Sequence, residues 1–288
     1  MSILRTVLLT AFALLAFAGN SVLCRLALGD GAIDAASFTV IRLLSGMVVL
    51  ALIIVASGSH KAAATKGNWP ASAMLFLYAI TFSYAYISLD TGTGALILFG
   101  SVQLTMIAVS LVSGNRLHAT EWLGVAIACT GFVYLVMPTL STPSFSGFLL
   151  MTIAGVAWGF YTLRGRGSAS PLSDTAYNFL RTLPLVVVLL VLTLRDMQLS
   201  QSGVLLAVLS GAVASGIGYT VWYIALGGLS VVQAAVVQLL VPVIATIGGV
   251  IFAGELLSLR LVMASLLVLG GILLVVLGRY YFVQRKAG

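Results

Sequence analysis

The chain has 288 residues, of which 61% are apolar and only 7% are charged, whereas soluble domains carry about 25% charged residues. This composition excludes a soluble enzyme and a disordered protein. The excess of Lys and Arg over Asp and Glu does not indicate nucleic-acid binding, because the basic residues lie singly between apolar runs. Cys24 and Cys129 both fall within apolar runs, so we expect no disulfide, metal site or cofactor. The sequence therefore predicts a polytopic membrane protein.

Ten apolar runs, each long enough to cross a bilayer as a helix, follow one another along the chain. A helical crossing needs about 20 apolar residues, whose backbone hydrogen bonds are satisfied internally. The runs lie near residues 5–27, 36–56, 70–89, 93–113, 119–138, 146–165, 173–194, 202–226, 229–253 and 260–282. The first run continues to Leu28, which is too long for a secretory signal, so we interpret it as an uncleaved helix. The predicted fold class is all-α, with ten transmembrane helices.

The distribution of positive charge predicts the orientation. With an even number of spans, both termini lie on the same side of the membrane. The segments on that side hold nine cations, namely Arg5, Lys61, Lys66, Arg116, Arg164, Arg166, Arg279, Arg285 and Lys286. The segments on the other side hold three, namely Arg25, Arg195 and Arg260. Because short loops rich in Lys and Arg stay in the cytoplasm, we expect both termini to be cytoplasmic.

The two halves of the chain match each other when the sequence is shifted by about 140 residues. The matched segments include Ile41-Arg42-Leu43-Leu44 with Leu180-Arg181-Thr182-Leu183, and Tyr86-Ile87-Ser88-Leu89 with Tyr223-Ile224-Ala225-Leu226. We therefore predict two five-helix repeats, residues 1–142 and residues 143–288. Because five is an odd number, the second repeat is inverted relative to the first. Inverted repeats are typical of secondary transporters.

Several short motifs recur in the order expected of one transporter family. They are Phe17-Ala18-Gly19-Asn20 and Ala157-Trp158-Gly159-Phe160, Arg42 and Arg181, and Val241-Pro242-Val243 followed by Gly254-Glu255-Leu256 and Gly270-Gly271. With these motifs the chain resembles the ten-helix branch of the drug/metabolite transporter superfamily, which is built from two EamA-type repeats. The first repeat departs from the pattern, because Gln103 replaces the proline and Asn115-Arg116 replaces the Gly-Glu pair.

The resemblance implies a multi-pass protein of the bacterial inner membrane. Within the superfamily the sequence is most similar to the amino-acid exporters, including bacterial exporters of aromatic amino acids. Spans 1, 3, 4, 6, 8 and 9 would then line a cavity, and the two halves would rock around it to give alternating access. The resemblance also implies a small-molecule substrate within a lipid bilayer, and we expect a monomer.

The acidic residues indicate the charge of the substrate. All seven lie at span ends or in loops, at Asp30, Asp34, Asp90, Glu121, Asp174, Asp196 and Glu255. A carboxylate at the bilayer centre normally marks proton coupling or cation binding. Its absence from the spans favours a neutral or zwitterionic substrate over a permanent cation.

Aromatic residues supply the first set of candidate substrate-binding residues. Tyr78, Phe82 and Tyr86 recur every four residues and so share one face of the third span. The eighth span offers Tyr219, Trp222 and Tyr223 at matching positions, and Trp158 belongs to the motif of the sixth span. These rings either line the cavity or pack helices, and those near span ends can also form an interfacial belt.

Polar residues within the spans supply the second set, namely Asn20, Ser101, Gln103 and Gln238. An amide or a hydroxyl at membrane depth faces protein or a water-filled cavity rather than lipid. Each of these groups therefore either lines the cavity or forms a hydrogen bond between helices.

The remaining notable residues within the spans have gating or structural roles. Arg42 and Arg181 occupy equivalent positions, from which both can extend toward opposite interfaces, cap loop carbonyls, form a gate ion pair or bind a substrate carboxylate. Pro184 and Pro242 either bend during gating or form static kinks. Small residues at 124, 128 and 131 in the fifth span and at 264, 270 and 271 in the tenth predict close packing between the halves.

The predicted function is the export of neutral, hydrophobic or aromatic, amino acids or similar small metabolites. No span holds paired Asp residues, a Ser with a reachable His or clustered metal ligands, so we expect no enzymatic activity. The alternative is a carrier of another solute class, such as a nucleotide sugar, a drug or a lipid, with the same fold.

Overall fold

The computed structural model describes residues 2–57, 65–114, 117–137, 143–165, 168–229 and 231–287. Across these ranges the protein is helical, apart from turns, loops and one isolated bridge between Ile33 and Leu199. The α-helices are α1 (Ile3–Leu28), α2 (Ala35–Ser57), α3 (Trp69–Ala85), α4 (Thr91–Val112), α5 (Ala119–Val136), α6 (Phe145–Gly165), α7 (Pro171–Arg181), α8 (Leu183–Thr193), α9 (Gln201–Leu209), α10 (Gly218–Leu226), α11 (Val231–Gln238), α12 (Leu240–Phe252) and α13 (Leu259–Ala287). A π-helix, η3 (Ser210–Ile217), joins α9 to α10, and a 3-10 turn, η2 (Leu194–Asp196), follows α8. The all-α prediction is confirmed for these residues.

Most of the predicted spans are helices of membrane-crossing length. Within the described ranges, nine helical segments have at least 18 residues and are apolar enough to cross a membrane. The remaining predicted span is α3, which has 17 residues and ends at Ala85, before the turn that leads to α4. The helices therefore follow the order of the ten predicted spans.

Prolines interrupt two of these spans. The predicted span 173–194 is divided between α7 and α8 at Thr182, and the span 229–253 between α11 and α12 at Leu239. A proline follows each break within three residues, at Pro184 and Pro242. Proline lacks an amide hydrogen and its ring obstructs the carbonyl four residues earlier. At each break the amide, of Thr182 or Leu239, bonds the carbonyl three residues before it, at 3.0 and 3.1 Å, and the Thr182 amide also bonds the Asn178 carbonyl at 3.2 Å.

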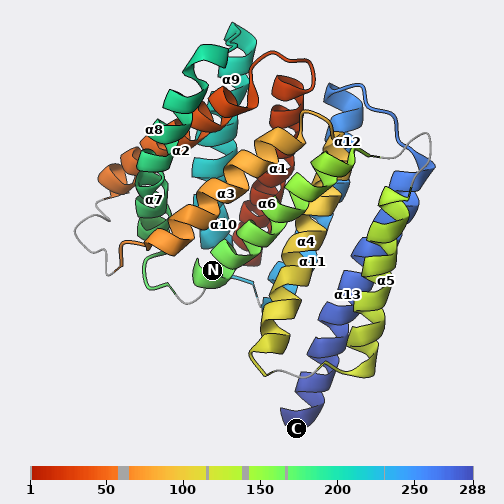
Figure 1. Ribbon diagram of the computed structural model, residues 1–288. Coiled ribbons are helices and arrows are strands. Elements are labelled where there is room, and N and C mark those ends of the chain that lie inside the picture. Colours follow the sequence, from red (N-terminus) through yellow and green to blue (C-terminus); the bar gives the residue numbers. More distant parts are fainter. Residues whose placement is uncertain are drawn as a thin grey trace.

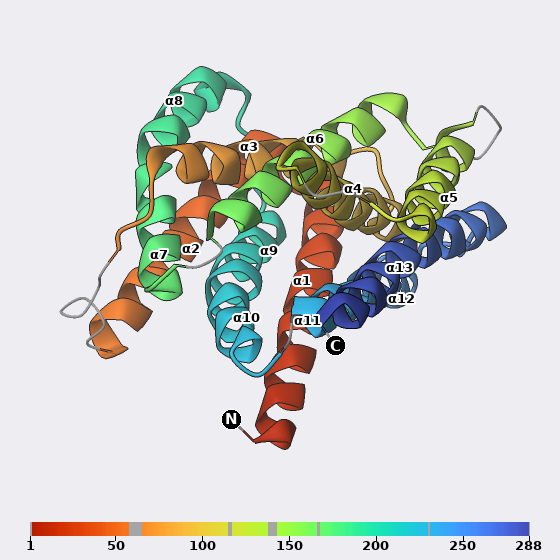
Figure 2. The same cartoon turned by 90° about the horizontal axis from the view of Figure 1, so that it is seen from below.

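Helices α5 and α13 form a pair at one side of the bundle, opposite α7 and α8 (Figures 1 and 2). Glycine permits the close approach within this pair, because a Cβ atom on Gly124 would lie 2.5 Å from the Gly271 carbonyl oxygen. The predicted packing of these small residues is confirmed there. It is wrong for Gly270, where an added Cβ atom would have no neighbour within 4 Å.

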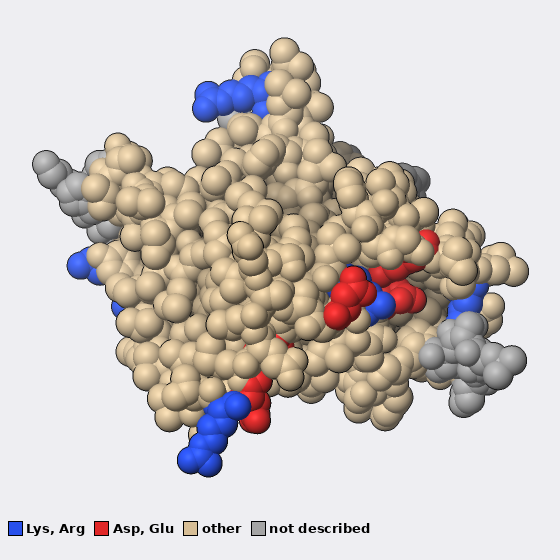
Figure 3. Space-filling model, turned by 90° about the horizontal axis from the view of Figure 1, so that it is seen from above, with Lys and Arg blue, Asp and Glu red and all other residues tan. Residues whose placement is uncertain are grey.

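The two ends of the bundle carry different charges. We call the end where α1 finishes and α4 begins the Arg25 end, and the opposite end, where α6 finishes, the Gly165 end. Five of the seven acids belong to the Arg25 end, namely Asp30, Asp34, Asp90, Asp196 and Glu255. Figure 3 looks onto this end and shows one group of acidic and basic atoms side by side, with further charged atoms toward the edges of the view.

Some predictions fall on residues that the structure does not describe. Lys61, Asn115, Arg116 and Arg166 lie outside the described ranges, as do residues 138–142, which adjoin the predicted repeat boundary. The side chains of Arg279, Arg285 and Lys286 are likewise not described.

Candidate functional site

A small pocket lies midway along α1, where six helical elements meet. The lining residues are Phe17, Asn20, Ser21, Tyr78, Phe82, Leu98, Phe99, Trp158, Ala214 and Tyr219. They belong to α1, α3, α4, α6, η3 and α10, which correspond to spans 1, 3, 4, 6 and 8. The free volume is about 20 Å³, which is the space of a single water molecule. In this conformation the lining side chains therefore occupy almost all of the space between the helices.

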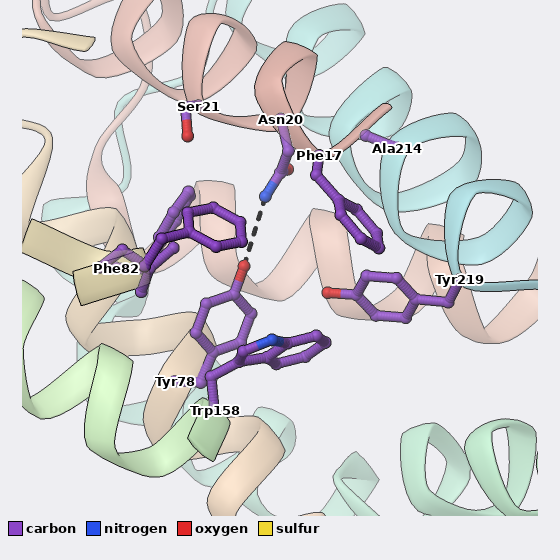
Figure 4. Close-up of a pocket in the computed structure, with 10 residues that line it drawn as sticks. Phe17, Asn20, Ser21, Tyr78, Phe82, Trp158, Ala214 and Tyr219 are labelled. Carbon is purple, nitrogen blue, oxygen red and sulfur yellow. Dashed lines mark hydrogen bonds between the residues drawn. The ribbon is translucent and has the colours of Figure 1, made fainter. Parts of the chain in front are cut away.

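Aromatic rings form most of the wall (Figure 4). The centroid of the Trp158 ring lies 4.8 Å from that of Tyr78 and 5.0 Å from that of Tyr219. The ring of Phe17 meets the Tyr219 ring edge-on at 5.8 Å, and Phe82 lies 5.3 Å from Tyr78. These separations fall within the favourable range for aromatic pairs. The rings offer apolar faces to a flat or hydrophobic ligand.

A larger cavity begins on the other side of three of these rings. Its volume is about 250 Å³, and Phe17, Trp158 and Tyr219 line it as well as the small pocket. It extends to the Gly165 end, where its further lining residues include Trp222, Tyr223 and Gln238. The last of these adds the ninth span to the cavity wall. We call this larger cavity the vestibule, and its shared rings separate it from the pocket.

A chain of buried polar groups supports the pocket. The Ser210 hydroxyl donates to Asn20 Oδ1 at 2.6 Å, and Asn20 Nδ2 donates to the Tyr78 hydroxyl oxygen at 3.4 Å (Figure 4). Arg42 Nη2 donates to the same oxygen at 2.9 Å. The chain joins η3, α1, α3 and α2, so the polar residues hold together helices from both halves of the sequence.

Among these four hydrogen-bonded polar residues, Arg42 alone carries a full charge, and its side chain is buried. Its relative exposure is 2%, and its guanidinium lies 4.8 Å from the centre of the Phe82 ring and 5.1 Å from that of Tyr78. Its Nη1 atom has no hydrogen-bond partner among the described residues, and no described carboxylate forms an ion pair with it. The side chain therefore does not extend to an interface, as the sequence allowed. The π-helix η3 covers this part of α2. It approaches so closely that a Cβ atom on Gly211 would clash with the Arg42 carbonyl oxygen.

Arg181 has a different environment, although the sequence places it at the equivalent position. It is partly exposed and donates to the Lys66 carbonyl oxygen in the segment before α3. Its guanidinium also lies 5.9 Å from the ring centre of Tyr177. Of the roles that the sequence allowed, this contact corresponds to capping a loop carbonyl.

A cluster of charges lies at the Arg25 end, about one helical turn along α1 from the pocket residue Ser21. Arg25 Nε lies 3.3 Å from Glu255 Oε1, and Arg25 Nη2 lies 3.6 Å from Asp90 Oδ1. The Glu255 carboxylate also accepts hydrogen bonds from the backbone amide and the hydroxyl of Thr91, at 2.8 and 2.9 Å. A further bond runs from Arg25 Nη1 to the Tyr86 carbonyl oxygen at 3.4 Å. The cluster thus fastens the end of α1 to the start of α4 and to the loop between α12 and α13.

Comparison with known proteins identifies the family. The chain is 50% identical over 275 residues to an uncharacterized protein of Pseudomonas aeruginosa, covering 96% of each chain. The sequence profile of the EamA-like transporter family matches residues 145–277. The chain belongs to the EamA-like transporter family. It is thus a multi-pass membrane protein of the drug/metabolite transporter superfamily.

More distant relatives agree with this assignment. This EamA-family chain is 23% identical over 225 residues to a probable amino-acid metabolite efflux pump of Salmonella typhimurium, covering 73% of this chain and 75% of the pump. A crystal structure of a protein that is 20% identical has the same fold, with a TM-score of 0.65, and the match covers 96% of this chain and 98% of the other.

The structure of this EamA-family chain brings together many of the residues that the sequence selected. Asn20, Tyr78, Phe82, Trp158 and Tyr219 line the pocket. The vestibule holds the selected residues Trp222, Tyr223 and Gln238.

Three selected residues lie elsewhere. The Tyr86 hydroxyl donates to the Thr91 carbonyl oxygen at 3.2 Å, which places this ring beneath the charge cluster rather than in the pocket. Ser101 lies where α4 meets α6, against Gly155. Gln103 is buried in α4 with no described partner for its amide nitrogen, and it lines neither cavity.

Sequence reasoning missed two aromatic residues of the pocket wall, Phe17 and Phe99, and one of the vestibule wall, Tyr161. A signal existed for Phe17, because it lies three residues before Asn20 and so shares a face of α1 with it. No comparable signal existed for Phe99, since α4 has 14 buried residues and is buried on every side over its first turns.

Proposed function

We propose that the protein is a secondary transporter that exports hydrophobic or aromatic neutral amino acids, or similarly small metabolites, across the bacterial inner membrane. The observation that supports this function best is the aromatic pocket, which lies between a vestibule at one end and a charge cluster at the other. Such a site can be reached from one side at a time, as alternating access requires.

The packing of the helices supports an exchange between two inverted repeats. Helix α3 packs on α6, and the segments α9, η3 and α10 pack in the same way on α1. If residues 1–142 and 143–288 form inverted repeats, these two contacts are equivalent. Rocking would then tighten one contact while it loosens the other, and access would move from the Gly165 end to the Arg25 end.

The charges support an orientation with the Gly165 end in the cytoplasm. Arg5, Lys66 and Arg164 belong to this end, whereas the Arg25 end carries most of the acids. Positive charge is retained on the cytoplasmic side. The vestibule then faces the cytoplasm, where an exporter collects its substrate, and one chain holds the whole site, which suits a monomer.

Transport by the purified protein in proteoliposomes tests the function. Vesicles loaded with radiolabelled phenylalanine, leucine, a nucleotide sugar or a fluorescent lipid are compared with protein-free vesicles. We expect phenylalanine to leave the vesicles faster only when the protein is present. If the lipid or the nucleotide sugar moves and neither amino acid does, the amino-acid assignment is wrong.

A matched pair of variants on α6 ties transport to the pocket. Trp158→Ala removes a ring that contacts Tyr78, Tyr161 and Tyr219, and we expect transport to fall about tenfold or more. Phe160→Ala removes a ring that is 39% exposed on the outer surface of the same helix, and transport should be unchanged. Equal transport by both variants would remove the pocket from the mechanism.

A further inference from the structure

We propose that the pocket binds its substrate through a carboxylate, which accepts a hydrogen bond from the Tyr78 hydroxyl. In this arrangement Arg42 and Asn20 hold that hydroxyl as a donor, and the substrate needs no amino group. The inference rests on the proposed function and narrows its substrate class to aromatic or hydrophobic monocarboxylates.

The hydrogen bonds around Tyr78 determine the direction of its hydroxyl proton. The oxygen accepts one bond from Arg42 Nη2 at 2.9 Å and one from Asn20 Nδ2 at 3.4 Å. A guanidinium has only donors, so the bond from Arg42 can run in no other direction. The Ser210 hydroxyl occupies Asn20 Oδ1 at 2.6 Å, which leaves the amide nitrogen to face Tyr78. Both lone pairs of the tyrosine oxygen are thus used, and its proton is free for a ligand.

The position of Tyr78 places this proton at the pocket. Tyr78 is one of the lining residues, and its hydroxyl points toward Asn20 and the space between the rings (Figure 4). The hydroxyl of Ser21 lies on the same wall. The pocket therefore presents the hydroxyls of Tyr78 and Ser21 on its α1 and α3 side, and on the opposite side the Trp158 ring and the hydroxyl of Tyr219, which points into the space between the rings (Figure 4).

The electrostatic environment favours an anion. The Arg42 guanidinium is buried, has one nitrogen without a described partner, and forms no ion pair with a described carboxylate. An isolated buried cation is costly, and a nearby anion reduces that cost. Phe82 and Tyr78 provide only the weaker attraction of their ring faces, at 4.8 and 5.1 Å. A bound carboxylate would supply the missing negative charge through the polarised hydroxyl of Tyr78.

No matching group exists for an ammonium. Neither Asp nor Glu is among the described residues that line the pocket or the vestibule. A zwitterionic substrate would leave the positive charge of Arg42 uncompensated, whereas a monocarboxylate neutralises it. An amino group would meet only ring faces and the uncharged hydroxyl oxygens of Ser21 and Tyr219. Removing the amino group from a ligand should therefore change its affinity little, whereas removing the carboxylate should lower its affinity strongly.

Binding to the purified protein in lipid nanodiscs tests this preference. The probes share one ring and differ in polar groups: phenylalanine, 3-phenylpropionate, phenylalanine amide and phenethylamine. We expect 3-phenylpropionate to bind at least as tightly as phenylalanine. Both compounds that lack a carboxylate should bind at least about tenfold more weakly. Calorimetry gives the affinities, and transport of the same four compounds is measured in parallel.

Variants of two tyrosines on α3 test the donor. Tyr78→Phe removes only the hydroxyl, so the preference for 3-phenylpropionate over phenethylamine should fall about tenfold. Tyr84→Phe removes the hydroxyl of a tyrosine that is 37% exposed on the same helix, and the preference should remain. Arg42 is a positioning residue, and Arg42→Lys, which keeps the charge, should retain more of the preference than Arg42→Gln. Because the readout is a ratio between ligands, a general loss of stability does not mimic it.

The outcomes separate this inference from the proposed function. If phenethylamine binds wild-type protein as tightly as 3-phenylpropionate, or if Tyr78→Phe keeps the full preference, carboxylate recognition is overturned. The proposal that the protein transports aromatic solutes would not be affected by that result. If none of the four compounds is bound or transported, the proposed function itself fails.

Discussion

The Arg25 end and the Gly165 end of the transporter are built from different interactions. At the Arg25 end, Arg25, Asp90 and Glu255 fasten three segments across the bundle. At the Gly165 end, the vestibule of about 250 Å³ leaves Trp222, Tyr223 and Gln238 along an open wall. A cavity of about 300 Å³ beside the charge cluster shares no lining residue with the pocket, whereas the vestibule shares Phe17, Trp158 and Tyr219 with it. Substitutions at the Arg25 end should therefore change the conformational balance and stability, and substitutions at the Gly165 end should change mainly affinity.

Loss of the Glu255 carboxylate should have the largest effect. Glu255→Ala removes the ion pair with Arg25 and the hydrogen bonds from Thr91, which together stabilise the closed end by about 2–4 kcal/mol. We expect the protein to open at the Arg25 end and close the vestibule. In a background without Cys24 and Cys129, labelling of Thr162→Cys, which lies in the vestibule, should slow about tenfold. Asp196→Ala, at an exposed acid of the same end, is the control and should label like wild type.

A glycine beneath the charge cluster should have the next largest effect. A Cβ atom on Gly94 would lie 2.5 Å from the Tyr86 ring, so Gly94→Ala should lower the free energy of unfolding by about 1–3 kcal/mol. Gly270→Ala places the same methyl group in open space on α13 and should stabilise the helix by up to about 1 kcal/mol. Denaturant unfolding in micelles measures both. Similar changes in the two variants would show that the region under the cluster is not tightly packed.

Asp34 should have a smaller, pH-dependent effect at the Arg25 end. Burial raises the pKa of its carboxyl, but hydrogen bonds from Ser37 and Gln198 outweigh burial and hold the pKa below its usual value. A lowered pKa in the folded state means that the stabilisation is present above the unfolded pKa of about 3.9 and is lost as the pH falls through the folded value.

Asp34→Asn should therefore cost about 1 kcal/mol near neutral pH and nothing at the acid limit. Unfolding midpoints of wild type and variant, measured between pH 6 and pH 3, should converge at low pH. A constant difference across this range would show that the charge of the Asp34 carboxylate does not stabilise the contact between the segment before α2 and the segment before α9.

The smallest effect on stability is expected at the Gly165 end. Gln238 lines the vestibule at the end of α11, so Gln238→Ala should change the free energy of unfolding by less than about 0.5 kcal/mol. The KM for transport should rise a few-fold, because a polar group on the entry path is lost. Should this variant instead unfold as readily as Gly94→Ala, the contrast between the two ends would be lost.

Sequence patterns predicted what depends on local spacing. The number and order of the spans follow from apolar runs, and the four-residue spacing of Tyr78 and Phe82 placed both on one wall of the pocket. The same spacing selected Tyr86, but α3 ends at Ala85, and the Tyr86 ring packs instead against Gly94 at the start of α4. Spacing predicts a shared face only as far as the helix continues.

Tertiary contacts determined what the sequence left open. The sequence predicts equivalent positions for Arg42 and Arg181, yet η3 covers Arg42, while Arg181 faces the segment before α3. The π-helical turn of η3 that brings Gly211 against α2 has no simple sequence signal. Similarly, the bond between Glu255 and Thr91 joins residues 164 positions apart, and no local pattern predicts it.

Side-specific labelling of Thr162→Cys tests most directly whether the pocket is reached from the Gly165 end. The cysteine is introduced into the background without Cys24 and Cys129, in proteoliposomes of known orientation, and a membrane-impermeant thiol reagent is added to one side. We predict reaction from the side of the Gly165 end only, slowed at least about threefold by a saturating aromatic substrate. Equal reaction from the Arg25 side, or no protection by any aromatic solute, would contradict the account.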